Sequence, residues 1–293
     1  MCVRRAMPLV ICSALLHGYV GWRIVPALAL PWSGAFAALL LASALLMPFG
    51  LWARRIRTQP LSDRLAWAGL LFMGLFSSLF VLTVLRDLLL LAAAAVVWVR
   101  PRSFSLEAFA ALSAAAVPLL GLALTALGLV NARRTAAVVT VDVPIADLPE
   151  ALHGFTIAQI SDLHVGPTIK GGYLERIVGA VNRIGADMVA VTGDLVDGSV
   201  LQLGAHVASL ARLESRHGTF FVTGNHEYYS GAPAWIAELR RIGLVVLLNE
   251  HVVLHHDAAS LVVAGVTDYG AHHYGADQRS DPAAALAGAL AAT

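Results

Sequence analysis

The sequence predicts a molecule in two parts, a bundle of membrane helices in residues 1–130 and an α/β layered domain in residues 131–293. Two observations predict this division. The chain is 58% hydrophobic and only 13% charged, whereas an ordinary soluble domain has about 25% charged residues. The charges are also unevenly spread, because long uncharged runs fill the first part and most Asp and Glu residues follow Val141.

Four apolar runs in the first part are each long enough to cross a bilayer, which takes about 20 helical residues. We expect membrane helices at 6–22, 33–53, 65–85 and 108–130. Arg4, Arg5, the first run and the small residues at 27–29 resemble a secretory signal with its cleavage site. Because the run is long and further spans follow it, we expect an uncleaved first helix.

Two charged residues, Arg86 and Asp87, interrupt the apolar pattern after the third expected span. The run that follows, Leu88–Val99, is short for a span of its own and would lengthen the third helix well beyond the bilayer. Neighbouring residues on a helix do not face each other, so we do not expect these two charges to neutralise one another. A place at the bilayer edge is favoured over one inside the bundle, where charged residues are commonly functional.

The arginines at the ends of the apolar runs predict the orientation. With four spans, one side holds Arg4, Arg5, Arg54, Arg55, Arg57, Arg64, Arg133 and Arg134, and the other holds Arg23, Arg100 and Arg102. The excess places both termini and the α/β domain in the cytoplasm, at an inner or plasma membrane. A fifth span at Leu88–Val99 would place the domain outside instead. The formal net charge of +1 gives no electrostatic reason to expect nucleic acid as a partner.

Strand and helix patterns alternate in the second part. Strands are predicted at 137–143, 155–160, 188–192, 219–223, 244–248, 252–254 and 261–266, and helices at 173–184, 201–213 and 233–242. The strands are short β-branched or apolar runs, and the helices carry apolar residues at helical spacing. This alternation predicts an α/β layered domain with largely buried strands.

Three of these strands are followed by residues that commonly bind metal ions. The motifs are Asp162-Leu163-His164, Gly193-Asp194-Leu195-Val196-Asp197 and Gly224-Asn225-His226-Glu227. Each alone has an ordinary explanation as a turn or a helix cap. Their recurrence at three consecutive strand ends, where an open α/β sheet binds its ligands, indicates a site. Carboxylate, amide and imidazole groups together suit Mn, Fe, Zn or Mg.

In order and spacing, the three motifs resemble those of the calcineurin-like metallophosphoesterase superfamily. The segments Gly154–His164 and Ala264–Asp268 resemble its bacterial membrane-associated branch, and the resemblance covers about Val138 to the C-terminus. It implies a layered sheet sandwich flanked by helices and two bound divalent ions of Mn, Fe, Zn or Mg. The implied reaction is hydrolysis of phosphomonoester, phosphodiester or pyrophosphate bonds by a water that the two ions activate.

The resemblance also implies a role for each motif residue. Asp162 and His164 would bind the first ion, Asp194 would bridge both ions, and Asn225 would bind the second. The remaining three would act around the metals, with His226 as general acid or transition-state stabiliser and with Asp197 and Glu227 in support. Membrane anchoring favours a phosphoester substrate that is lipid-linked or close to the membrane.

The sequence departs from the family pattern after the third motif. That pattern continues with a histidine after another strand and a Gly-His-x-His element, and nothing like Gly-His-x-His occurs here. Five later histidines lack the strand-then-ligand context and are expected on loops or the surface: His251, His255, His256, His272 and His273. We therefore expect a domain that is incomplete at its C-terminal end, with weak metal binding because few ligands remain.

Two other functions stay open at this point. One is a catalytically inactive membrane protein that retains a partial metal site. The other is a transporter-like or structural bundle, with the α/β part as a regulatory appendage.

Overall fold

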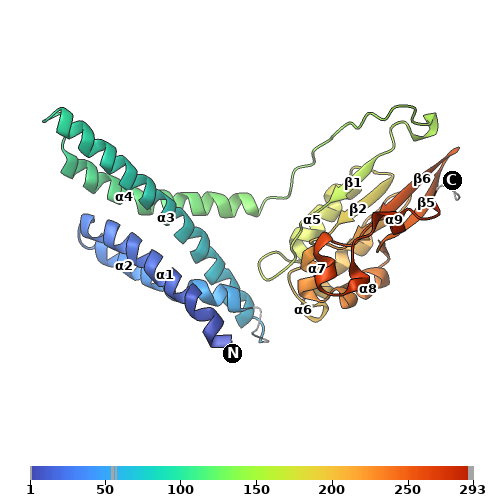
Figure 1. Ribbon diagram of the computed structural model, residues 1–293, viewed down its shortest axis with the longest axis horizontal. Helices are drawn as coiled ribbons and strands as arrows, with labels where there is room; N and C mark the ends of the chain where they lie inside the picture. Colours follow the sequence, from blue (N-terminus) through green and yellow to red (C-terminus); the bar gives the residue numbers. More distant parts are fainter. Residues whose placement is uncertain (1, 54–55, 57, 290–293) are drawn as a thin grey trace. The chain divides into compact units, whose positions relative to one another are not determined.

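The computed structural model describes residues 2–53, 56 and 58–289. The chain forms two compact units, Met1–Arg134 and Thr135–Thr293. The helical unit comes first along the chain and the α/β unit follows it (Figure 1).

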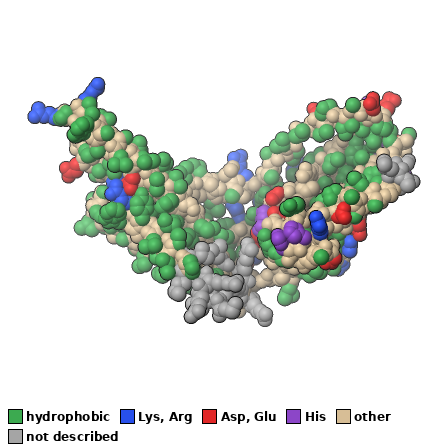
Figure 2. Space-filling model, in the orientation of Figure 1, with side chains coloured by type: hydrophobic (Ala, Val, Ile, Leu, Met, Phe, Trp, Pro, Cys, Tyr) green, Lys and Arg blue, Asp and Glu red, His purple; other side chains and the backbone are tan. Residues whose placement is uncertain are grey.

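Among its described residues, the first unit has four helices that are long and apolar enough to cross a membrane. They are α1 (Cys2–Ile24), α2 (Trp32–Trp52), α3 (Leu61–Val99) and α4 (Leu106–Ala132). Many of their large apolar side chains point outward, and Figure 2 shows hydrophobic side chains over much of the visible face of this unit. An apolar exterior of this kind is the surface that lipid chains cover.

Helix α3 is a single helix through the two charged residues and the apolar run that follows them. It has 39 residues and is therefore about 58 Å long at about 1.5 Å per residue, roughly twice the thickness of a bilayer core. Its closest neighbour is α2, because a Cβ atom at Gly50 would lie only 2.9 Å from the backbone of Gly69. Small residues that let two backbones approach are typical of helix contacts in membranes.

Arg86 is buried in the interior of the helical unit rather than displayed at its surface. Its guanidinium donates hydrogen bonds to the carbonyl oxygens of Arg23 (3.2 Å) and Ala110 (3.0 Å). The carboxylate of Asp87 accepts bonds from Arg23 (2.8 Å) and from the hydroxyl of Tyr19 (2.8 Å). Arg86 Nη1 also lies 3.7 Å from Asp87 Oδ1, within the distance of an ion pair. The expectation that these adjacent charges would not pair was therefore wrong.

The second unit is an α/β domain, as the sequence predicts. Its main sheet is parallel, in the order β1 (Ile157–Ile160), β2 (Met188–Thr192), β3 (Thr219–Val222) and β4 (Val245–Val246). A second, antiparallel pair consists of β5 (Glu250–His256) and β6 (Ala259–Gly265). The helices are α5 (Gly171–Asn182), α6 (Val200–Val207), α7 (Asn225–Ser230), α8 (Ala232–Arg241) and α9 (Pro282–Ala285).

Side-chain alternation along the main sheet gives the domain its layers. Val189, Val191 and Phe221 point to one face, where they pack with apolar residues of α5, α6 and α8. Met188 and Phe220 point to the other face and pack with Leu254 and other residues of β5 and β6. The main sheet is therefore sandwiched between helices and the β5–β6 pair, and burial of each large aliphatic side chain contributes about 1.5–3 kcal/mol.

One predicted element was wrong, and a second differs in its C-terminal half. The segment 137–143 is not a strand but an extended, exposed segment, in which the side chain of Val139 is 80% exposed. Its alternating pattern suits a strand, yet among the described residues no strand pairs with it, and a strand needs a neighbour for its hydrogen bonds. The predicted helix 201–213 ends as an α-helix at Val207 and continues as a 3₁₀ turn, Ala208–Arg212.

Candidate metal centre

The three motif segments meet at the carboxyl ends of β1, β2 and β3. Backbone hydrogen bonds hold the loops together: Asp162 N–H donates to the carbonyl of Gly193 (3.3 Å), and His164 N–H donates to that of Asp194 (3.0 Å). The third segment joins through the N–H of His226, which donates to Asp194 Oδ1 (3.0 Å). The parallel sheet thus places residues that lie more than 60 positions apart in one site.

The backbone at this edge takes unusual conformations. Asp162, His164 and Asp194 have positive φ angles of 56°, 47° and 53°, a conformation that is uncommon for non-glycine residues and easiest for Asp, Asn and His. At Gly193 the φ angle is +81°, and a Cβ atom there would lie 2.5 Å from the backbone nitrogen of Gly224. The glycines of the second and third motifs therefore allow the loops after β2 and β3 to approach closely.

One group of donor atoms is formed by Asp162, His164 and Asp194, which together could hold a metal ion. His164 Nε2 lies 3.9 Å from Asp162 Oδ1 and 4.0 Å from Asp194 Oδ2. Two ligands with bonds of about 2.0–2.2 Å can reach a common ion from such separations. The donor set is carboxylate and imidazole, as the sequence predicts.

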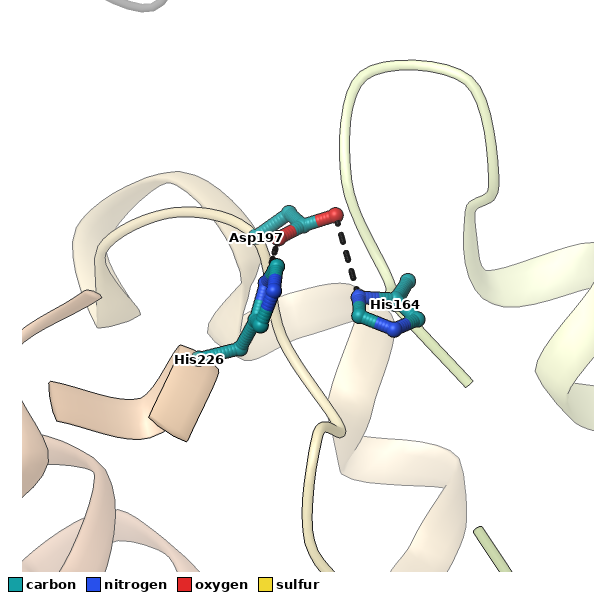
Figure 3. Close-up of side chains that lie close together, drawn as sticks. All are labelled: His164, Asp197 and His226. Atoms are coloured by element: carbon teal, nitrogen blue, oxygen red, sulfur yellow. Dashed lines mark hydrogen bonds and ion pairs between the residues drawn. The ribbon is translucent and has the colours of Figure 1, made fainter. Parts of the chain in front are cut away.

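A second group is formed by His164, Asp197 and His226, which also could hold a metal ion. The carboxylate of Asp197 lies between the two imidazoles, 2.5 Å from His226 Nδ1 and 3.4 Å from His164 Nδ1 (Figure 3). The rings of His164 and His226 meet edge to face, with centroids 4.4 Å apart. His164 therefore contributes one ring nitrogen to each group.

Glu227 is fully buried beneath these groups. Its carboxylate accepts three backbone N–H bonds, from Gly224 (2.7 Å), Leu195 (2.8 Å) and Asp194 (3.0 Å). Burial raises the pKa of the Glu227 carboxyl, and the three hydrogen bonds oppose this rise. The side chain ties the loop after β2 to the start of α7.

Asn225 is the first residue of α7 and lies beside His226. Its amide nitrogen donates a hydrogen bond to the hydroxyl of Tyr229 (3.1 Å). The ring of Tyr229 also packs against His226, with centroids 5.3 Å apart. Tyr229 was not among the predicted site residues, although its position four residues after Asn225 puts it on the same side of a helix.

Residues 155–279, which contain all three motifs, match the family model for calcineurin-like phosphoesterases. The α/β unit belongs to the calcineurin-like metallophosphoesterase superfamily. Members of this superfamily generally use divalent metals, and the two donor groups are consistent with that use.

The relatives of this metallophosphoesterase domain include membrane proteins. A transmembrane protein with metallophosphoesterase domain from Danio rerio is 37% identical over 145 residues, which cover 48% of this chain and 33% of the relative. The protein of the same description from Bos taurus is 39% identical over 160 residues, covering 52% and 36%. The chain therefore spans about a third of the length of these relatives.

Bacterial relatives match the same domain. An uncharacterized metallophosphoesterase from Helicobacter pylori is 39% identical over 113 residues, covering 39% of this chain and 30% of the relative. A UDP-2,3-diacylglucosamine pyrophosphatase from Chlamydia muridarum is 33% identical over 78 residues, covering 26% and 24%. No solved structure matches the chain.

The five later histidines of the metallophosphoesterase domain have partners elsewhere. His251 bonds to the carbonyl of Ala285, His255 to Ser260, His256 to His217 and His272 to the carbonyl of Tyr269, and His273 packs against His272. Neither donor group found among the described residues includes any of them. Three of the five lie within β5, where His255 is exposed and His256 is buried, so the expected place on loops or the surface was wrong for His256.

Proposed function

We propose that this chain is a membrane-anchored, metal-dependent phosphoesterase that hydrolyses phosphomonoester, phosphodiester or pyrophosphate bonds. The observation that carries the proposal is the convergence of the three motifs at one edge of a parallel sheet, in a domain of the metallophosphoesterase superfamily. The four apolar helices that precede the domain supply the anchor.

The donor chemistry fits divalent cations. Asp162 and Asp194 supply carboxylate oxygens and His164 supplies an imidazole nitrogen, all within one group of closely spaced atoms. Hard oxygen and imidazole donors suit Mn, Fe, Zn or Mg, and no thiolate is available because both cysteines lie in the first unit.

For the arrangement of ligands, we infer two ions. Asp162 and His164 would hold the first, Asp194 would be shared between both, and the side-chain oxygen of Asn225 would bind the second. Bound divalent ions supply Lewis-acid polarisation of the phosphoryl group and activation of water. Asp194 suits the shared position because a carboxylate has two oxygens, and its Oδ1 already lies against the N–H of His226 at the start of α7.

His226 serves as the general acid in this proposal. Its Nδ1 is bonded to Asp197 at 2.5 Å, so Nδ1 carries a proton that the carboxylate accepts. As general acid, the ring would give the proton on Nε2 to the oxygen of the leaving group. Asp197 therefore sets the orientation of the imidazole.

A substrate linked to a membrane lipid is supported by two observations. The domain is tethered to four helices that can cross a membrane, and one bacterial relative is named a UDP-2,3-diacylglucosamine pyrophosphatase. The arginine distribution, eight against three, supports a cytoplasmic domain at an inner or plasma membrane.

The test is hydrolysis of a generic aryl phosphodiester by the full chain in detergent with added Mn²⁺. We expect activity that a chelator removes and Mn²⁺ restores, and we expect its loss in Asp194→Ala. Asp142→Ala is a matched control, because Asp142 is an exposed carboxylate in the segment before the domain core. Equal rates for the wild type and Asp194→Ala would contradict the proposal and favour an inactive protein with a partial metal site.

A further inference from the structure

Asn225 differs from the other proposed ligands in having two unlike atoms at its tip. Only the oxygen of an amide can bind a cation, because the amide nitrogen is a donor with no free lone pair. The ligand role therefore requires the amide to be turned one way, with its nitrogen bonded to an acceptor elsewhere. A carboxylate in the same place would need no such control, since its two oxygens are equivalent.

Tyr229 supplies the acceptor. Its hydroxyl accepts the hydrogen bond from Asn225 Nδ2 at 3.1 Å, one helical turn further along α7. The side chain is 61% exposed, so burial of the phenol does not explain its place. Its ring lies beside His226 at 5.3 Å, so the same side chain contacts the proposed second-ion ligand and the proposed acid.

The neighbouring tyrosine behaves differently. Tyr228 is buried, and its hydroxyl is paired with Thr223 Oγ1 (3.3 Å) and Gln278 Oε1 (3.5 Å). It therefore packs against the body of the domain, whereas Tyr229 faces the metal centre. The two adjacent residues provide a matched pair of the same residue type on the same helix.

We propose that Tyr229 is a positioning residue that fixes the amide of Asn225 so that its oxygen faces the second ion. This inference rests on the proposed function, since it assumes that Asn225 is a ligand. Without the phenol oxygen, the amide nitrogen would lose the acceptor that holds the side chain in this orientation.

The experiment is a titration of the full chain in detergent with Mn²⁺. The concentration of free Mn²⁺ is measured at each step by electron paramagnetic resonance. Asn225→Ala first identifies the binding step that depends on this ligand. In Tyr229→Phe we expect the affinity of that step to fall about 10–100-fold, as is usual when a partner that orients a ligand is lost. The other step is expected to keep its affinity, and Tyr228→Phe is expected to change neither.

A second background separates positioning from general damage to the site. With Asn225→Asp, the ligand has two equivalent oxygens, so adding Tyr229→Phe is expected to leave the Mn²⁺ affinity unchanged. An equal loss in the Asn225 and Asn225→Asp backgrounds, or no loss in either, would overturn the inference. Failure of the proposed function is distinguishable, because it would appear as a wild-type chain that binds Mn²⁺ without hydrolysing the aryl phosphodiester.

Discussion

Asp197 is the side chain on which the chemistry of this site depends most closely. It contacts His226 at 2.5 Å and His164 at 3.4 Å, so one carboxylate joins the proposed acid to a proposed metal ligand. A carboxylate that orients an imidazole is common in sites where a histidine transfers a proton. The proposed role of His226 in proton transfer can be tested separately from metal binding, because His226 is not one of the proposed ligands.

His226→Ala is expected to reduce kcat by about 10²–10⁴-fold, the usual contribution of a general acid, while leaving the bound metal in place. The reason is that the protonated ring is lost but the proposed ligands Asp162, His164 and Asp194 remain. The loss should be greatest for alkyl phosphodiesters, whose leaving groups need a proton, and smaller for aryl phosphodiesters. Steady-state kinetics on both substrates and metal analysis of the purified chain check this.

The opposite pattern would assign His226 a different role. If the variant loses metal, or if both classes of substrate slow equally, His226 is a ligand or a structural residue rather than an acid.

Glu227→Gln is expected to lower the free energy of unfolding of the α/β domain by about 1–3 kcal/mol, because a buried amide N–H₂ would face backbone N–H groups that need an acceptor. The wild-type carboxylate accepts from Gly224, Leu195 and Asp194. Pulse proteolysis of the full chain across a urea series measures the change. Glu250→Gln is the control, since Glu250 is exposed in β5, and an equal effect there would contradict the explanation.

At the scale of elements, the sequence allowed accurate prediction where local pattern and burial agree. The strand at Met188–Thr192 was predicted with its observed bounds because a short, buried apolar run leaves few alternatives. Helix α7 was missed because its six residues are mostly polar and show no apolar periodicity. Its first turn is stabilised by Glu227, which accepts a hydrogen bond from the N–H of Gly224. The segment 137–143 was predicted wrongly because alternation in a sequence says nothing about whether a partner strand is present.

Long-range pairs were equally invisible in the sequence. Arg86 and Asp87 were recognised as unusual, but their partner Arg23 lies 64 residues before Asp87. Periodicity describes one helix at a time, so it cannot identify the neighbour that a charged residue meets. Tyr229 was not predicted as a site residue for the same reason, because its contact with Asn225 is visible only in the structure.

The contact between α2 and α3 gives a prediction at this scale. Gly69→Leu is expected to destabilise the helical unit by about 1–3 kcal/mol, because overpacking forces neighbouring backbones apart, and a Cβ atom at Gly69 would already lie 2.9 Å from the carbonyl oxygen of Leu46. Gly74→Leu on the same helix is the matched control, since nothing lies within 4 Å of a Cβ there. Thermal aggregation of both variants in detergent tests this, and equal midpoints would contradict it.

For the whole molecule, the arginine asymmetry favours an orientation with the domain inside and the loop between α3 and α4 outside. Both natural cysteines lie in the first unit, at Cys2 and Cys12, so they can be replaced by serine without touching the site. Exposed residues are available for labelling on each side.

In that cysteine-free background, Ser103→Cys and Thr140→Cys each introduce one exposed thiol, the first between α3 and α4 and the second in the segment that leads to the domain. With a membrane-impermeant maleimide on intact cells, we expect Ser103→Cys to be labelled and Thr140→Cys to be labelled only after the membrane is opened. Labelling of Thr140→Cys on intact cells would reverse the proposed orientation and place the phosphoesterase site outside. Only α4 lies between the two positions. If both thiols were labelled on intact cells, both would lie on the same side of the membrane, and α4 would not be a membrane-spanning helix.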